Sequence, residues 1–232
     1  MSADLAKINA AAAAVDLVEH GMTLGLGTGT TAAHFVRLLG LRAQQGLKVR
    51  GVATSDATAR LAEECGVPLL DADKIGALDL AVDGADEVDG AFQLIKGGGA
   101  ALLREKIIAD AARHFVVIAD ESKMVERLGA LPLPVEVTPF GYPLTAAKIY
   151  AVLRDSGCAG TDVALRESAP NFPVVTDGGN FVLDCKCRSI PHAGDLAERL
   201  KRITGVVEHG LFIGMARTVI VGKAKSADVM ER

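Results

Sequence analysis

Short apolar runs alternate with helix-like segments over the first 120 residues, and this alternation constrains the fold more than any other feature. The apolar runs cover residues 22–26, 48–53, 79–82 and 115–119. The helix-like segments before and between them cover residues 2–20, 32–39, 57–65 and 100–112. Strands separated by helices form βαβ units, so the pattern predicts a parallel sheet with helices on both faces. Half of the residues are hydrophobic, which suits a largely buried sheet.

The order of elements changes near Pro134. A strand, a helix and a strand are predicted, then a hairpin with its turn at 177–180, a helix and a strand; they cover residues 135–137, 144–154, 162–166, 174–183, 195–203 and 206–212. This is the order of a split βαβ sandwich, so residues 132–212 are predicted to form a smaller α+β, ferredoxin-like domain. A last strand at 217–221 can return to the first sheet. The larger α/β domain, with its parallel Rossmann-like sheet, is therefore expected to comprise residues 1–131 and 213–232.

Charge and cysteine content narrow the function classes. The formal net charge is −4 and no run of like charges stands out, which argues against a general nucleic-acid or acidic-membrane surface. No signal-peptide pattern and no apolar run near the roughly 20 residues of a membrane span is seen, so a cytoplasmic protein is expected. Cys185 and Cys187 are predicted to face the same side of a strand. Since no second cysteine pair follows, reduced thiols are favoured over a zinc site.

A glycine- and threonine-rich loop, Gly25–Thr31, links a predicted strand to a helix. Glycines let the backbone approach an anion, and the N-terminus of the next helix favours negative charge. A dinucleotide fingerprint would need glycine at Thr30, and Asp56 is poorly placed as its acidic partner. A nucleotide P-loop would need a lysine that is absent. The loop fits a phosphate-binding turn without a nucleotide, and a purely structural strand–helix turn is the alternative.

Two aspartates, Asp83 and Asp86, flank Gly84 and Ala85 where a strand is predicted to end. Ligands of open parallel sheets bind at that edge, and clustered carboxylates can act as acids or bases. A solvated acidic loop or helix cap is the structural alternative, and oxygen ligands would also suit Mg²⁺.

Three consecutive glycines, Gly97–Gly99, follow Lys96 and precede a predicted helix. Such a run is entropically costly, so it indicates a structural or functional requirement. It would let a ligand lie against the backbone and the helix N-terminus.

Glu105 lies off the solvent face of that predicted helix. Lys106, Asp110 and Arg113 share the polar arc, whereas Glu105 falls among apolar residues. A carboxylate in such surroundings is either paired or takes part in chemistry, and a general base is one such use. The alternative is a buried structural ion pair, for which Arg104 is a candidate partner. Farther on, Lys123 follows another strand end and could close on a phosphate.

These segments, in this order, resemble those of the ribose-5-phosphate isomerase family of the A type. The resemblance rests on Gly-Leu-Gly-Thr-Gly-Thr-Thr, Val-Asp-Gly-Ala-Asp-Glu, Ile-Lys-Gly-Gly-Gly-Ala-Ala-Leu-Leu-Arg-Glu-Lys, Ile-Ala-Asp-Glu-Ser-Lys, Leu-Pro-Val-Glu-Val, Val-Thr-Asp-Gly-Gly-Asn and Gly-Val-Val-Glu-His-Gly-Leu-Phe. It extends over nearly the whole chain. One departure is Thr30, where many relatives have serine, and the hydroxyl is kept.

The resemblance implies interconversion of ribose 5-phosphate and ribulose 5-phosphate through an enediol, in the non-oxidative branch of the pentose phosphate pathway. Glu105 would be the base, and Asp83, Asp86 and Lys96 would handle hydroxyl protons and stabilise the oxyanion. The implied substrate-binding residues are Thr28, Gly29, Thr30, Thr31, Asp83, Gly84, Ala85, Asp86, Lys96, Gly97, Gly98, Gly99 and Lys123. No metal and no organic cofactor is implied, and the enzyme would be a cytoplasmic homodimer or higher homo-oligomer.

Two other functions remain open from the residues alone. An amino-sugar phosphate deaminase would share the Gly/Thr loop and would release ammonia from glucosamine 6-phosphate. A non-catalytic sugar-phosphate sensor would not need Glu105, Asp83, Asp86 and Lys96 together. It would also be expected to carry a DNA-binding module, for which the start of the chain leaves no room.

Overall fold

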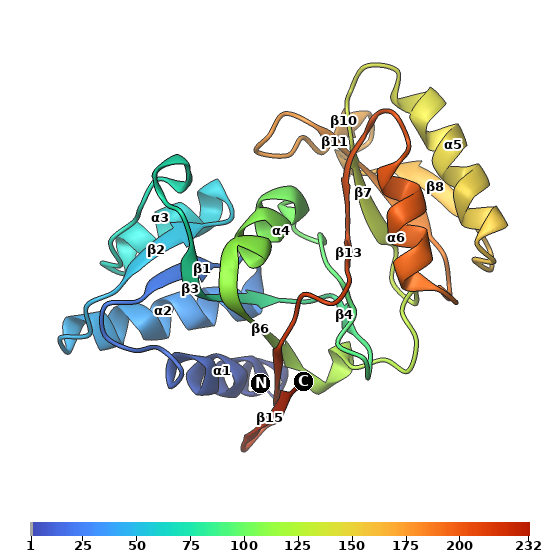
Figure 1. The fold of residues 1–232 in the computed structure, drawn as a ribbon. Coiled ribbons are helices and arrows are strands. Elements are labelled where there is room, and N and C mark those ends of the chain that lie inside the picture. Colours follow the sequence, from blue (N-terminus) through green and yellow to red (C-terminus); the bar gives the residue numbers. More distant parts are fainter. Residues whose placement is uncertain (1) are drawn as a thin grey trace. The chain divides into compact units, whose positions relative to one another are not determined.

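The computed structural model describes residues 2–232, which divide into two compact units (Figure 1). Of the described residues, the first unit comprises 2–85, 104–124 and 215–232, and the second comprises 86–103 and 125–214. These units differ from the predicted domain boundaries, because residues 86–103 and 125–131 group with the second unit. The chain thus passes between the units four times, where the sequence pattern predicted two crossings.

The first unit is built on a six-stranded sheet of order β15-β14-β6-β3-β1-β2. Five strands are parallel and β15 pairs antiparallel with β14. Its strands are β1 (Thr23–Leu26), β2 (Arg50–Ala53), β3 (Leu78–Gly84), β6 (Ala112–Asp120), β14 (Thr218–Gly222) and β15 (Ala227–Glu231). Its helices are α1 (Ser2–Val15), α2 (Thr30–Gln44), α3 (Asp56–Glu64) and α4 (Leu102–Ala111, the first two residues in the second unit), with 3-10 turns η1 (Ala72–Lys74) and η2 (Glu121–Lys123). The predicted parallel α/β sheet is therefore confirmed.

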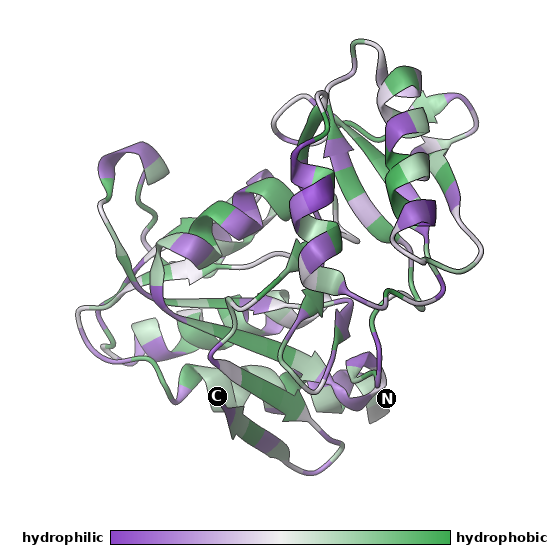
Figure 2. Cartoon of the chain, turned by 45° about the vertical axis from the view of Figure 1, so that its right-hand side comes forward, coloured by the Kyte–Doolittle hydropathy of each residue, from purple (hydrophilic) through white to green (hydrophobic). Residues whose placement is uncertain are grey.

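Alternating residues of β1 face opposite sides of this sheet, as strand geometry requires. Leu24 and Leu26 join the buried cluster that α1 and α2 supply with residues such as Phe35. Gly25 faces the other way, where a Cβ would come within 2.4 Å of the Ile108 side chain of α4. Figure 2 shows the sheet as a largely hydrophobic layer. Helices therefore cover both faces, with α1 and α2 on one and α4 on the other.

The second unit contains a four-stranded antiparallel sheet of order β12-β7-β11-β8. Its elements are β7 (Leu133–Val137), α5 (Tyr142–Asp155), β8 (Asp162–Leu165), β11 (Phe181–Lys186), α6 (Ala193–Lys201) and β12 (Val206–His209). In chain order the strands are arranged 4-1-3-2, which is the split βαβ arrangement. The predicted ferredoxin-like α+β order is thus confirmed. A smaller antiparallel sheet joins β13 (Leu211–Phe212), β5 (Leu94–Ile95) and β4 (Glu87–Val88).

Three local predictions were wrong in detail. The first helix ends at Val15 rather than residue 20, since the chain tightens into i→i+3 turns there. The predicted strand 206–212 is split by Gly210, whose N–H and carbonyl bond to Pro134 and Lys96. The predicted hairpin at 174–183 keeps its tight turn, but its first arm makes a single bridge. A short hairpin of β9 (Glu167–Ala169) and β10 (Phe172–Pro173) precedes it instead.

The four cysteines are free thiols. Cys185 and Cys187 are both fully buried in the core of the second unit, as their predicted common face requires. Burial raises the pKa of the Cys185 thiol far above its ordinary value, so this thiol stays protonated and packs as an apolar side chain.

Candidate functional site

The strand order of the first unit creates a switch point between β1 and β3. From β1 the chain moves outward to β2 and then returns to β3 on the opposite side of β1. The loops that leave the carboxyl ends of β1 and β3 therefore diverge, and ligands of open α/β sheets bind in such crevices. These two loops carry Gly27–Thr31 and Asp83–Ala85, two of the predicted site segments.

Asp83 ties the two loops together. Its Oδ1 accepts hydrogen bonds from the backbone N–H of Thr28 at 3.0 Å and of Gly84 at 2.7 Å. The side chain is only 3% exposed. A carboxylate that accepts backbone N–H bonds in a buried place is held in one orientation. The sequence predicted that Asp83 and the threonine loop each follow a strand of the parallel sheet. The structure shows a direct hydrogen bond between them.

The hydroxyl of Thr28 lies in a cluster of hydroxyl groups. It contacts Thr54 Oγ1 at 2.7 Å, Ser55 Oγ at 2.8 Å and Thr58 Oγ1 at 3.1 Å. Thr58 in turn donates to the carbonyl of Gly27 at 3.0 Å. The side chain of Thr28 thus anchors the loop to the residues that follow β2, and the backbone N–H groups that follow Thr28 begin helix α2.

Helix α2 begins directly after this loop. Gly29 is its N-cap, with φ of 111°, and glycine has no side chain that could cap the helix. Thr30 is exposed and Thr31 half-buried in the first turn. The first N–H groups of a helix lack partners inside the helix and attract anions. The positive φ explains why glycine occupies position 29.

Lys7 of α1 lies beside this loop, and the sequence pattern did not single it out. Its Nζ donates to Thr30 Oγ1 at 3.0 Å, so a cation stands beside the first turn of α2. A single lysine in an Ala-rich helix carries no recognisable signal. Lys123, which was predicted, ends η2 after β6 and is half-buried. Its ammonium has no hydrogen bond or ion pair to any residue in the range 2–232.

Glu105 is buried in the first unit, with 4% of its surface exposed. Ile108 and Ala109 of the same helix are also buried, whereas Asp110 is exposed, so the predicted apolar arc is confirmed. Glu105 and Asp83 line the same narrow hollow, together with Gly25 and Gly27.

Small residues on β1 and β3 let α4 approach the sheet closely. A Cβ at Gly25 would lie 2.4 Å from Ile108 and 2.8 Å from the Cβ of Ala81. Glu105 precedes Ile108 by one helical turn, so the same close approach brings its carboxylate to the edge where Asp83 lies. Arg104, the candidate structural partner of Glu105, pairs with Asp56 at 2.8 Å.

The remaining predicted residues belong to the second unit. There the N–H of Gly98 donates to Asp86 Oδ2 at 2.8 Å, so Asp86 and the glycine loop are in direct contact. Lys96 is 3% exposed, and its Nζ lies 5.5 Å from the centre of the Phe212 ring. Gly97 has φ of 112°, and a Cβ there would meet Leu102 at 2.8 Å. Burial of a lysine beside an aromatic face keeps its ammonium in a fixed place.

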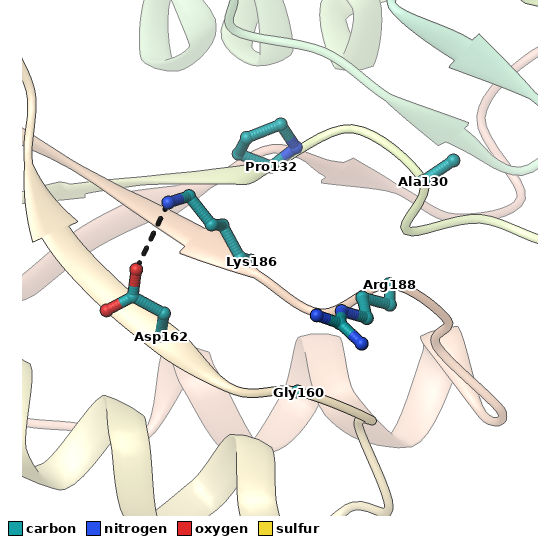
Figure 3. Close-up of a pocket in the computed structure, with 6 residues that line it drawn as sticks. All are labelled: Ala130, Pro132, Gly160, Asp162, Lys186 and Arg188. Carbon is teal, nitrogen blue, oxygen red and sulfur yellow. Dashed lines mark ion pairs between the residues drawn. The ribbon is translucent and has the colours of Figure 1, made fainter.

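The second unit has a hollow of its own, of about 480 Å³, and none of the predicted site residues lines it (Figure 3). It is lined by Ala130, Pro132, Gly160, Asp162, Lys186 and Arg188. Its carboxylate, Asp162, forms an ion pair with Lys186 at 3.2 Å. Across residues 2–232 no group of three or more His, Cys, Asp or Glu side chains is arranged to hold a metal ion. No helix of the same range is long and apolar enough to cross a membrane.

The family model described as ribose 5-phosphate isomerase A (phosphoriboisomerase A) matches residues 50–226. The chain belongs to this family. Its members are aldose–ketose isomerases by name, so the resemblance seen in the sequence is confirmed. Ribose-5-phosphate isomerase A of Maricaulis maris is 57% identical, with both chains covered completely. That of Nitrobacter hamburgensis is 51% identical, again over the full length of both.

Solved structures of the family have the same fold. Ribose 5-phosphate isomerase A of Methanocaldococcus jannaschii is 39% identical with a TM-score of 0.88, covering 99% of each chain. A D-ribose-5-phosphate isomerase in complex with phospho-erythronic acid is 38% identical, with a TM-score of 0.90 and full coverage of both chains. The isomerase A fold is therefore shared along the whole chain.

Proposed function

We propose that the chain interconverts D-ribose 5-phosphate and D-ribulose 5-phosphate through an enediol, with Glu105 as the general base. The observation that carries this proposal is the buried pair Glu105 and Asp83, which line one hollow at the switch point of the sheet. Membership of the isomerase A family supports ribose 5-phosphate as the substrate. So does the related structure with phospho-erythronic acid, because that molecule combines a carboxylate with a phosphate.

The proposed reaction moves one proton between two neighbouring carbons. The Glu105 carboxylate takes the proton from C2 of the open-chain aldose, and the electrons of that C–H bond form the enediol double bond. Glu105 then returns the proton to C1, which gives the ketose. Asp83, Asp86 and Lys96 move the hydroxyl protons of O1 and O2 and stabilise the negative charge that develops there. C1 is reduced as C2 is oxidised, so there is no net redox change and the step balances without an external oxidant or reductant.

The phosphate is proposed to bind at the threonine loop. The uncapped first turn of α2, residues Thr30 and Thr31, offers N–H and hydroxyl donors. Lys7 stands beside Thr30 and Lys123 follows β6 at the carboxyl edge of the same sheet. Thr28, Gly29 and Gly84–Ala85 shape this edge, and Gly97–Gly99 are proposed to bind the sugar.

Lys123→Ala is expected to raise KM for ribose 5-phosphate by about tenfold while kcat changes less than about threefold. A lost charge-assisted contact to a phosphate weakens substrate and transition state equally. Steady-state kinetics of the variant measure both constants. Lys225→Ala, an exposed lysine of the same unit, is the matched control and should leave KM unchanged. An unchanged KM in Lys123→Ala would refute the phosphate contact.

The decisive assay is conversion of ribose 5-phosphate to ribulose 5-phosphate by the purified protein in cofactor-free buffer with EDTA. Turnover is expected to be undiminished by the chelator, because the proposed proton transfers use side chains alone. Loss of activity on EDTA and its return with Mg²⁺ would replace this mechanism by a metal-assisted one. No turnover by folded protein would refute the proposed substrate, and glucosamine 6-phosphate would be tested next.

A homodimer in the cytoplasm is part of the proposal. Four free thiols suit a reducing compartment. Phe140, just before α5, and Leu144, in its first turn, are 95% and 74% exposed, and large apolar side chains exposed together are typical of an interface. Light scattering is expected to give twice the chain mass of 24.1 kDa. Phe140→Ser with Leu144→Ser should lower it to that of one chain, whereas the exposed Leu41→Ser should not. A wild-type mass of one chain would refute the dimer.

A further inference from the structure

Arg166, directly after β8, makes four hydrogen bonds that join a strand to the glycine loop. Its Nε and Nη2 donate to the two carboxylate oxygens of Asp184 on β11, at 2.9 and 2.5 Å. Its Nη1 donates to the carbonyl oxygens of Gly97 at 2.8 Å and of Gly98 at 3.1 Å. The side chains of Arg166 and Asp184 are 17% and 26% exposed. All of these residues belong to the second unit.

This geometry needs arginine. The carboxylate of Asp184 occupies one edge of the planar guanidinium, which fixes its orientation, and the remaining nitrogen faces the loop. Lysine has a single ammonium and cannot hold a carboxylate by two parallel bonds while it also donates to two carbonyls. Arg166 therefore acts as a rigid bracket between the sheet and the loop.

The bracket decides which way the loop's peptide groups point. In a trans peptide the carbonyl of one residue and the N–H of the next point in opposite directions. With the carbonyls of Gly97 and Gly98 turned to Arg166, the N–H groups of Gly98 and Gly99 are directed away from it. The N–H of Gly98 indeed donates to Asp86 Oδ2, at 2.8 Å. The peptide group between Gly97 and Gly98 thus links the two side chains, because its carbonyl accepts from Arg166 and its N–H donates to Asp86.

The other contacts of the loop do not replace this bracket. Gly97 O also accepts the N–H of Ala100 at 3.0 Å, a bond within the turn itself. Ala100 has a positive φ of 58°, which is unfavourable for a residue with a Cβ. A run of three glycines has little preference for any conformation of its own. External bonds are therefore needed to keep the loop in one form.

We propose that Arg166 is a positioning residue for the isomerisation: anchored by Asp184, it holds the Gly97–Gly99 loop so that Asp86, bound by the Gly98 N–H, meets the reacting oxygens in a fixed orientation. The inference rests on the proposed function, since it assigns Asp86 and the loop to the reaction. Arg166 itself need not touch the substrate.

Arg166→Lys tests the proposal by separating kcat from KM. It is expected to lower kcat by at least about tenfold and to change KM by less than about threefold, because small misplacements of reacting groups act on the chemical step. The matched control is Lys186→Met, which breaks the other ion pair between β8 and β11, the one with Asp162. It should leave kcat unchanged. A kcat of Arg166→Lys within twofold of the wild type would overturn the proposal.

Chemical rescue distinguishes positioning from a general loss of structure. In Arg166→Ala, millimolar guanidinium chloride is expected to restore kcat several-fold, whereas sodium chloride at equal ionic strength should not. The wild type and Lys186→Met should not respond. Absence of rescue in a variant with wild-type Tm would overturn the proposal. If Arg166→Ala does not fold, Asp184→Asn replaces it, with an intermediate loss of kcat expected and no loss contradicting the bracket.

The backbone amide of Gly98 gives a readout that does not depend on turnover. Its NMR resonance in substrate-free protein is expected to move in Arg166→Lys and to stay in place in Lys186→Met. If the wild type does not isomerise ribose 5-phosphate, the proposed function fails while this resonance still reports on the loop. An unmoved resonance together with wild-type turnover in Arg166→Lys would refute the bracket itself.

Discussion

Glu105→Gln is expected to lower kcat for ribose 5-phosphate by about 1,000-fold while the Kd of the substrate changes less than about threefold. Glutamine has the shape of glutamate but cannot accept a proton from carbon, and a positioned general base contributes about 10²–10⁴-fold. Glu105 is buried on a helix that packs closely on the sheet, so an isosteric change preserves its surroundings. Steady-state kinetics and calorimetric titration measure the two constants.

A second readout of the same variant follows the proton directly. In D₂O the wild type is expected to incorporate deuterium into the substrate, because a carboxylate that carries the proton exchanges it with solvent. Glu105→Gln should show no incorporation. Asp110→Asn is the matched control, since Asp110 is an exposed carboxylate on the same helix. Deuterium incorporation by Glu105→Gln at the wild-type rate would exclude Glu105 as the base.

The burial of Glu105 could be predicted because it follows from helix periodicity alone. The spacing to Ile108 and Ala109 places it on the inner arc, and the structure confirms this. Its distance from the sheet could not be predicted in the same way. That distance depends on Gly25 meeting Ile108, a contact between residues 83 positions apart in the chain.

The parallel sheet was predictable since its parallel strands are mostly apolar and each ends at, or is directly followed by, a glycine or a polar residue. The strands β4 and β5 could not be predicted, because each has only two residues and a pattern of alternating apolar side chains cannot be recognised over two residues. They matter because they draw residues 86–103 into the second unit. The sequence placed Asp83 and Asp86 on one loop, yet they fall in different units.

Lys7 and the pair Arg166 and Asp184 escaped prediction for a related reason. Each is an ordinary charged residue in its own segment, and only its hydrogen bond to a residue far along the chain distinguishes it. Arg166 meets Asp184 only because β8 and β11 pair with Leu165 opposite Leu183. Strand register of this kind depends on the packing of a whole face, which no local pattern encodes.

Gly27→Ala is expected to reduce kcat by about 100-fold and to lower the free energy of unfolding by about 1–3 kcal/mol. A Cβ at Gly27 would lie 2.2 Å from Asp83 Oδ1 and 2.6 Å from its Cα. The backbone of Asp83 cannot yield as a flexible side-chain end would, so β1 and β3 must separate or the Asp83 carboxylate must turn. Overpacking of this size costs about 1–3 kcal/mol, and a shift of about 1 Å can cost about 100-fold in rate.

Two further glycines of the first unit separate the loss of stability from the loss of activity. Gly76→Ala meets nothing within 4 Å, so both quantities should stay at the wild-type level. Gly222→Ala brings a Cβ within 1.9 Å of the Ala6 carbonyl, where α1 packs on β14. It is expected to lower the free energy of unfolding much as Gly27→Ala does but to leave kcat within about threefold of the wild type at a temperature where it is folded.

Equal kcat values for Gly27→Ala and Gly222→Ala would mean that the bond between Asp83 and Thr28 does not position the site. A kcat that falls only in Gly27→Ala would tie catalysis to this bond, because the two variants then share their instability and differ in the contact they disturb.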